Sequence, residues 1–135
     1  MDQTHTGSCL CGTAKFELVG EFKKFFLCHC SRCRKSSGSA HCSNLFAPGA
    51  KLNWLSGAEK LSFYQHEDTH FSRTFCSICG SNLPTDSKAR GAVIVPAGCL
   101  DTDVELSPQA HLFTSSKGNW DDGFGDLPTF EGMPS

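Results

Sequence analysis

The stretch Cys28-His29-Cys30-Ser31-Arg32-Cys33-Arg34-Lys35 places three thiols and three basic side chains in eight consecutive positions. Two further cysteine pairs flank it, in Cys9-Leu10-Cys11-Gly12 and in Cys76-Ser77-Ile78-Cys79-Gly80. Seven of the nine cysteines therefore lie in three short clusters. Thiols grouped this closely usually hold a metal ion. We expect the rest of the chain to form the scaffold for metal binding.

The length and composition favour a single globular domain that spans residues 1–135. The formal charge of −2 gives no electrostatic reason to expect nucleic acid or an anionic membrane as a partner. No apolar stretch approaches the roughly 20 residues that a membrane-spanning helix needs. Residues 1–6 are polar and lack the basic and apolar segments of a secretory signal. We therefore expect a cytoplasmic protein, and the sequence leaves its oligomeric state open.

The cysteine count also bears on the redox state of the thiols. Disulfides rarely persist in a reducing cytosol, and nine is an odd number. A C-x-C pair is poorly placed to bridge to itself, because the geometry of a disulfide is demanding. A disulfide framework is the alternative to metal binding, and we favour metal.

Alternating polarity predicts a chain built from strands. From Thr13 to Val19 the apolar residues Ala14, Phe16 and Leu18 alternate with polar ones, which is typical of a half-buried strand. Further strands are expected at residues 25–28, 41–47, 51–55, 61–65, 70–75, 92–95 and 110–114. Residues 34–39 are too short and too rich in Ser and Gly for more than one or two helical turns.

No sustained helical period, internal repeat or linker is present. The fold class that we predict is all-β, with mostly antiparallel sheets and little helix. From Ser115 onward Gly, Asp, Asn and Pro dominate, so we expect an irregular tail pinned by Trp120 and Phe124.

The seven clustered thiols divide into a set of four and a set of three. Each flanking pair is followed directly by a glycine, Gly12 or Gly80, which eases the backbone of a tight turn. We expect these two pairs to form one closed zinc site, with 64 residues between its halves. Its predicted ligands are Cys9, Cys11, Cys76 and Cys79.

The central cluster supplies the remaining three predicted ligands, Cys28, Cys30 and Cys33. Three protein ligands leave a fourth coordination position for water or substrate, which is typical of catalytic zinc. The alternative is that His29, Cys42, Cys99 or another residue completes this site and makes it structural.

Several motifs together resemble one protein family. They are Gly7-Ser8-Cys9-Leu10-Cys11-Gly12, the central stretch with Ser37-Gly38, Arg73-Thr74-Phe75-Cys76-Ser77-Ile78-Cys79-Gly80-Ser81, Ala97-Gly98-Cys99-Leu100-Asp101, and His111 with Ser115-Ser116, Trp120 and Leu127-Pro128. This order resembles the glutathione-dependent formaldehyde-activating enzyme family, which also includes centromere protein V. The resemblance implies a β-tent fold and two zinc ions per chain, bound by the four and by the three cysteines. It also implies the condensation of formaldehyde with glutathione, a carbon–sulfur lyase reaction written in reverse.

The leading hypothesis is therefore a zinc-dependent carbon–sulfur lyase that joins a small thiol, by resemblance glutathione, to an aldehyde such as formaldehyde. Its catalytic residues would be Cys28, Cys30 and Cys33. The basic residues Arg32, Arg34 and Lys35 would bind carboxylates of the thiol, or else form a solvated face beside the metal. The alternatives are a non-catalytic zinc module that binds a protein partner, and the same fold acting on another thiol or carbonyl adduct.

A few single residues also allow an expectation. His29 lies between two predicted ligands, so its ring should point away from the metal, most simply as a surface histidine. The alternative is that it supports the metal ligands or carries a proton. His5 has no motif around it and is expected at the surface. Arg73 precedes the second flanking pair and is expected to shield its thiolates. Cys42 and Cys99 are expected to be small buried apolar residues.

Overall fold

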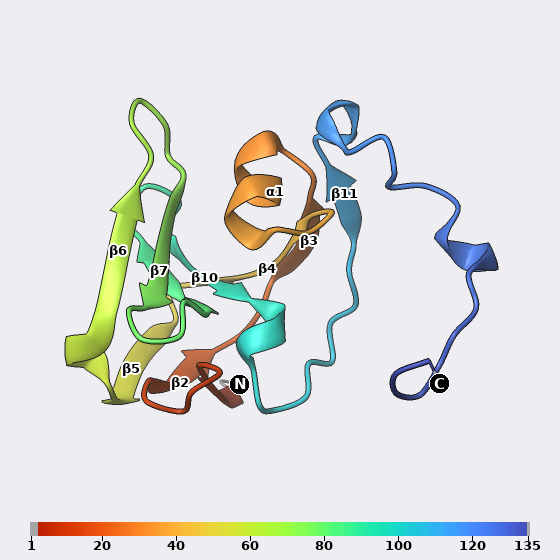
Figure 1. Cartoon of the computed structure of the whole chain (residues 1–135). Helices are drawn as coiled ribbons and strands as arrows, with labels where there is room; N and C mark the ends of the chain where they lie inside the picture. The colour runs from red at the N-terminus through yellow and green to blue at the C-terminus, as the bar shows by residue number, and fades with distance from the viewer. Residues whose placement is uncertain (1–2, 135) are drawn as a thin grey trace.

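The computed structural model describes residues 3–134, and strands dominate it (Figure 1). Met1, Asp2 and Ser135, which belong to the expected domain 1–135, lie outside the described residues. The strands are β1 (Gln3–Ser8), β2 (Lys15–Gly20), β3 (Lys24–Cys28), β4 (Cys42–Pro48), β5 (Lys51–Ser56), β6 (Leu61–Gln65), β7 (Ser72–Cys76), β8 (Asn82–Leu83), β9 (Thr85–Ser87), β10 (Ala92–Pro96) and β11 (Ala110–Leu112). Residues 3–134 contain one α-helix, α1 (Ser31–Ser37), and four short 3₁₀ helices, η1 (Ala58–Lys60), η2 (Ala97–Cys99), η3 (Thr114–Ser116) and η4 (Phe124–Asp126).

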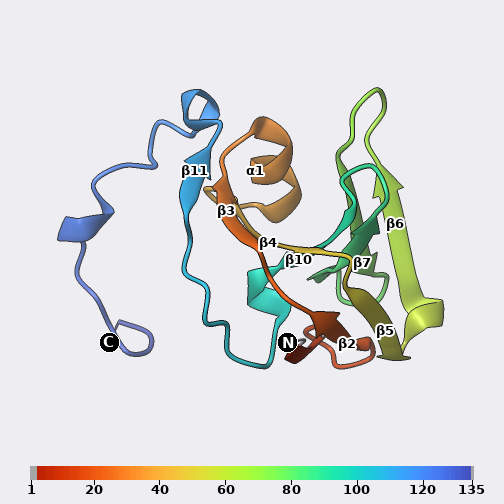
Figure 2. The same cartoon turned by 180° about the vertical axis from the view of Figure 1, so that it is seen from behind.

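The strands form three sheets, seen from opposite sides in Figures 1 and 2. Their orders are β1-β2-β5, β11-β3-β4-β10-β9 and β6-β7-β8. Every pairing among them is antiparallel except that of β11 with β3, which is parallel. The all-β prediction, with little helix, is confirmed.

The strand β2 shows how the sequence pattern becomes a buried face. Ala14, Phe16 and Leu18 are each 0% exposed, as the alternation of residues 13–19 predicts. The strand β1 was not predicted, because its residues are mostly small or polar. It pairs with β2 along its whole length and places His5 opposite Leu18. His5 is consequently buried and packs against the ring of Phe22, so its expected surface position was wrong.

Two apolar clusters hold the sheets together. The first lies between the first two sheets and consists of Leu18, Phe25, Leu45, Ala47, Val93 and Val95. The second joins the first sheet to the third and consists of Cys9, Ala14, Phe16, Cys76 and Leu83. Apolar packing and cysteine ligands therefore occur in the same layer, so that metal binding at these thiols would be coupled to the folding of two sheets.

The helix α1 is short because its sequence carries capping residues at both ends, seven helical residues apart. Cys30 is the N-cap residue, and its Sγ accepts a hydrogen bond from the Cys33 backbone N–H at 3.3 Å. Gly38 closes the helix in the left-handed region, with φ of 65°. Arg34 and Lys35 lie in the last turn, where the helix dipole favours positive charge. These signals place both Cys30 and Cys33 on one rigid element.

After β11 the chain is largely irregular, as the sequence predicts, with only the short helices η3 and η4, and its last part lies apart from the sheets in both views (Figures 1 and 2). Trp120 and Phe124 are 55% and 53% exposed, and Phe124 lines a small cavity together with His29 and His111. That these two rings pin the segment stays a prediction. Among the helices of residues 3–134, none has the length and apolar character required to cross a membrane.

Candidate metal centres and the adjoining pocket

The two flanking cysteine pairs lie on matching turns. In the first, the Gly12 backbone N–H donates to the Cys9 carbonyl oxygen at 3.0 Å. In the second, the Gly80 N–H donates to the Cys76 carbonyl oxygen at 2.8 Å. Gly12 and Gly80 have φ values of 80° and 78°, a region that favours glycine. Each turn therefore directs its two sulfurs toward the same side.

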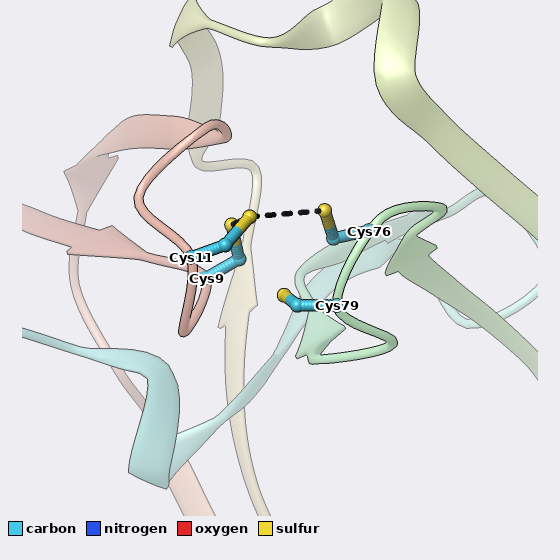
Figure 3. A group of neighbouring side chains, drawn as sticks. All are labelled: Cys9, Cys11, Cys76 and Cys79. Atoms are coloured by element: carbon cyan, nitrogen blue, oxygen red, sulfur yellow. Dashed lines mark hydrogen bonds between the residues drawn. The ribbon is translucent and has the colours of Figure 1, made fainter.

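These turns meet to form the four-cysteine site, which we define as Cys9, Cys11, Cys76 and Cys79 (Figure 3). The four sulfurs all lie within 4.8 Å of one another. The Sγ atoms of Cys9 and Cys11 are 3.6 Å apart, and those of Cys11 and Cys76 are 3.9 Å apart. All four are free thiols, so this donor set fits a tetrahedral metal ion such as zinc.

Polar groups around the four-cysteine site hydrogen-bond its sulfurs and favour the ionised form of Cys79. The Ser81 hydroxyl lies 3.2 Å from the Cys79 sulfur, and its hydrogen bond is the main reason that the pKa of Cys79 is lowered to about 5. Ser81 also accepts a hydrogen bond from the Leu10 backbone N–H at 2.9 Å, which ties the two turns together. The Ala14 N–H donates to the Cys9 sulfur at 3.3 Å. Such hydrogen bonds orient metal-bound thiolates.

Cys28, Cys30 and Cys33 form a second group, the three-cysteine site. Cys28 ends β3, whereas Cys30 and Cys33 belong to the first turn of α1 and its cap. The three sulfurs lie within 4.8 Å of one another, and all three residues are buried. This donor set also fits a metal ion. Whether each group binds zinc, and in what number, stays a prediction.

Cys42 lies beside the three-cysteine site without belonging to the metal-ligating group found in residues 3–134. It pairs with Cys28 across β3 and β4, and its Sγ donates to the Cys33 carbonyl oxygen at 3.3 Å. The hydrogen bond between the thiols of Cys42 and Cys33 raises the pKa of Cys33 and lowers that of Cys42. Cys99 is the half-buried last residue of η2, and burial raises the pKa of its thiol to about 12.

A pocket of about 580 Å³ opens onto the three-cysteine site. One wall comes from α1, β3 and β4, and the other from the β6–β7 turn, β7, and the segment from β8 to β10. Its charged lining residues are Arg32, Arg73, Arg90 and Asp68. The arginines outnumber the single carboxylate, so the pocket suits an anionic ligand.

The basic residues expected to contact substrate fall in different places. Arg32 lines the pocket, whereas Arg34 and Lys35 are not part of its lining. Arg34 is half-buried, and its Nε has no hydrogen-bond partner among the described residues. Lys35 is exposed on α1. Consecutive helical residues point about 100° apart, which explains why one cluster of charges does not face one pocket.

Arg73 lines this pocket and does not shield the four-cysteine site, contrary to our expectation. Arg73 and Cys76 are three positions apart on β7, and side chains at odd spacing in a strand lie on opposite faces. The Arg73 guanidinium packs 4.6 Å from the centre of the Phe75 ring and donates to the Asn82 side-chain oxygen. Its Nε finds no acceptor in residues 3–134.

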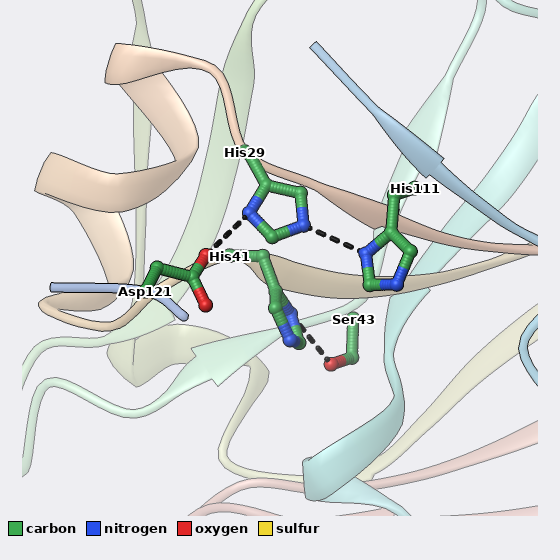
Figure 4. Close-up of polar contacts among 5 residues, drawn as sticks. All are labelled: His29, His41, Ser43, His111 and Asp121. Carbon is green, nitrogen blue, oxygen red and sulfur yellow. Dashed lines mark hydrogen bonds and ion pairs between the residues drawn. The ribbon is translucent and has the colours of Figure 1, made fainter. Parts of the chain in front are cut away.

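His29 points away from the cysteines, as predicted, but it is only 3% exposed, so its expected surface position was wrong. Its Nδ1 lies 2.9 Å from the Asp121 carboxylate, and its Nε2 lies 2.8 Å from Nδ1 of His111 (Figure 4). The His41 ring packs edge-on against it at 5.1 Å. Sequence reasoning missed this cluster because Asp121 is distant in sequence, in a segment without secondary structure.

The sequence profile of a protein family described as glutathione-dependent formaldehyde-activating enzyme matches residues 4–116. The chain belongs to this family. A crystal structure of a Rhodobacter sphaeroides protein is also similar, with a TM-score of 0.58 and 25% sequence identity. The alignment covers 78% of this chain and 98% of that chain.

The resemblance inferred from the motifs is thus confirmed, although Trp120 and Leu127-Pro128 lie beyond the matched residues. Membership of the glutathione-dependent formaldehyde-activating enzyme family supports a role in chemistry related to glutathione and formaldehyde. The cysteine groups suit two metal centres of different design. One joins two distant turns, and the other adjoins a pocket.

Proposed function

We propose that this protein is a zinc-dependent carbon–sulfur lyase that joins a small thiol, glutathione by family, to formaldehyde or a similar aldehyde. The observation that carries the proposal is the opening of the three-cysteine site onto the pocket of about 580 Å³. Pockets of this size hold small-molecule ligands. A purely structural metal site would have no need of such an opening.

The lining of the pocket fits a thiol that carries carboxylates. Arg32 lies beside the cysteines, while Arg73 and Arg90 come from the opposite wall. The planar guanidinium groups of arginine pair well with carboxylates. Arg32 thus remains a proposed substrate contact, together with Arg73 and Arg90. The exposed position of Lys35 favours the solvated-face alternative, whereas Arg34, half-buried and outside the pocket lining, fits neither role.

The donor set determines what the three-cysteine site offers to a substrate. Its three sulfurs converge from two elements, and Cys33 and Cys30 are fixed by the cap of α1. Cys28, Cys30 and Cys33 would hold a zinc ion through three thiolates, and such an ion would supply a position at which a thiol can bind with a lowered pKa. The role of the protein is then to hold the substrate sulfur beside the aldehyde carbon, which supplies much of the acceleration.

In the reaction a sulfur–carbon bond forms as the carbonyl π bond breaks, and the thiol proton is transferred to the carbonyl oxygen. His41 lines the pocket, where it is half-buried. Burial lowers the pKa of His41, and the neighbouring His29 lowers it further, so its imidazole is neutral at pH 7. A neutral imidazole can accept a proton and pass it on. We propose that His41 moves this proton.

The test is exchange NMR with ¹³C-labelled formaldehyde and glutathione, which form the adduct slowly without a catalyst. The intact zinc-loaded protein should accelerate the exchange, and Cys30→Ser should abolish the acceleration. Cys99→Ala is the matched control, since Cys99 belongs to neither cysteine group and should retain full acceleration. Exchange at the uncatalysed rate with the intact protein would contradict the proposed reaction.

A further inference from the structure

Residues 118–134, which we call the C-terminal arm, are not explained by the proposed function. They lie beyond residues 4–116, which match the family. Five large apolar side chains of the arm are at least half exposed: Trp120, Phe124, Leu127, Phe130 and Met133. Clusters of exposed apolar side chains mark surfaces that bind another molecule. The arm therefore needs a partner surface.

The root of the arm is fixed, so the arm projects in a defined direction. The Asp121 carboxylate lies 2.9 Å from Nδ1 of the buried His29 (Figure 4). Beyond this point the backbone hydrogen bonds within residues 122–134 are local, such as Leu127 N–H to the Phe124 carbonyl oxygen at 3.3 Å. Twelve residues, 123–134, can reach about 40 Å when extended.

The accessible surface of the chain is larger than that of a compact monomer. It is 8576 Å², whereas a folded monomer of 14.6 kDa exposes about 6,900 Å². The excess is about 1,700 Å², and the exposed arm contributes to it. If two chains each bury most of this excess surface, the total area buried in the interface falls within the roughly 2,000–5,000 Å² that permanent homodimers bury.

The charges favour the body of a second copy over a second arm as the binding surface. The arm carries Asp121, Asp122, Asp126 and Glu131 and no basic residue, a net charge of −4. Because the whole chain has a net charge of −2, residues 1–117 carry +2. Two arms would therefore repel each other, whereas an arm and the body of another copy attract each other.

The body offers a suitable surface on β5 and β6, which follow each other in the chain. Each is the edge strand of its sheet, with unpaired backbone groups on one side. Their exposed apolar side chains are Leu55, Phe63 and Tyr64. Lys51, Glu59 and Lys60 lie exposed in the same segment, which leaves it one net positive charge. An extended, acidic and apolar arm matches such an edge in both backbone and side-chain chemistry.

From these observations we infer that the protein is a homodimer in which the C-terminal arm of each copy packs on the β5–β6 surface of the other. The interface is reciprocal, as two-fold symmetry requires. The arm's root lies on the His29 side of the central cysteine cluster, away from the lining of the pocket of about 580 Å³.

The test is sedimentation equilibrium of the zinc-loaded full chain at micromolar concentration. The intact protein should have a mass of about 29 kDa, twice the 14.6 kDa of one chain. The double variant Phe124→Ser/Phe130→Ser and the single variant Phe63→Ser should both sediment as monomers. Leu10→Ser removes an apolar side chain that is 88% exposed outside the proposed interface, and it should remain dimeric.

Each of the other outcomes would overturn the inference. An intact protein of 14.6 kDa would mean that the arm is left for a different partner. A dimer that persists in the arm variant would place the interface elsewhere. A dimer that persists in Phe63→Ser would exclude the β5–β6 surface. Circular dichroism of each variant checks that the fold is retained, which we expect because all the substituted side chains are more than half exposed.

Discussion

Replacing one cysteine from each of the two cysteine sites should separate the roles of the sites, and the structure gives the size of the difference. The four-cysteine site joins Cys11 to Cys76 across 64 residues. Closing a loop of about 65 residues removes about 4 kcal/mol of chain entropy from the unfolded state. The three-cysteine site spans only residues 28–33. Closing so short a loop removes only about 2 kcal/mol of chain entropy from the unfolded state.

We therefore expect Cys79→Ala to lower the free energy of unfolding by about 2 kcal/mol more than Cys33→Ala does. For a chain of 135 residues this corresponds to a melting temperature lower by roughly 6–10 °C. The assay is thermal denaturation of both zinc-loaded variants, followed by circular dichroism, with metal content measured on the same samples.

Side-chain packing alone predicts the opposite order, which makes the comparison decisive. Cys33 is 5% exposed, whereas Cys79 is only half-buried, so loss of packing should be greater for Cys33→Ala. Equal melting temperatures, or a lower one for Cys33→Ala, would refute the division into a structural and an open site.

Two further substitutions test other parts of the structure. Asp121→Asn removes the charge that faces buried His29 and should lower the free energy of unfolding by about 1–3 kcal/mol in urea denaturation. The control, Asp122→Asn, changes an exposed neighbour and should have no measurable effect. Equal losses of unfolding free energy in the two variants would argue against the contact between Asp121 and His29. Gly7→Ala would place a methyl group 2.3 Å from the Phe16 ring, so we expect a loss of more than about 2 kcal/mol. Gly98→Ala, where nothing lies within 4 Å, is the control, and a Gly7→Ala protein as stable as this control would contradict the close approach.

The sequence predicted those features that depend on local patterns. Strand β2 follows from the alternation of residues 13–19, and β6 was predicted with its observed bounds, Leu61–Gln65. The two flanking cysteine pairs carry their own turn signals in Gly12 and Gly80, so the four-cysteine site could be anticipated from spacing alone.

Features that depend on distant contacts could not be predicted in this way. The polar strand β1 forms because β2 offers it an edge, which no pattern within residues 3–8 reveals. Arg73 faces the pocket because it lies on the face of β7 that is turned toward the pocket. Which face that is depends on how the three sheets pack together, which the local sequence does not reveal. His29 is buried because Asp121 and His111 return to it from 92 and 82 positions further along the chain.

The central claim is that the three-cysteine site takes a substrate thiol at the fourth position of its metal ion. X-ray absorption at the zinc edge tests it most directly, because sulfur neighbours can be counted. With two zinc ions per chain we expect an average of about 3.5 sulfur ligands per zinc without thiol, rising to about 4 when glutathione is added. An average of four sulfurs before glutathione is added, or a count that glutathione leaves unchanged, would contradict the account.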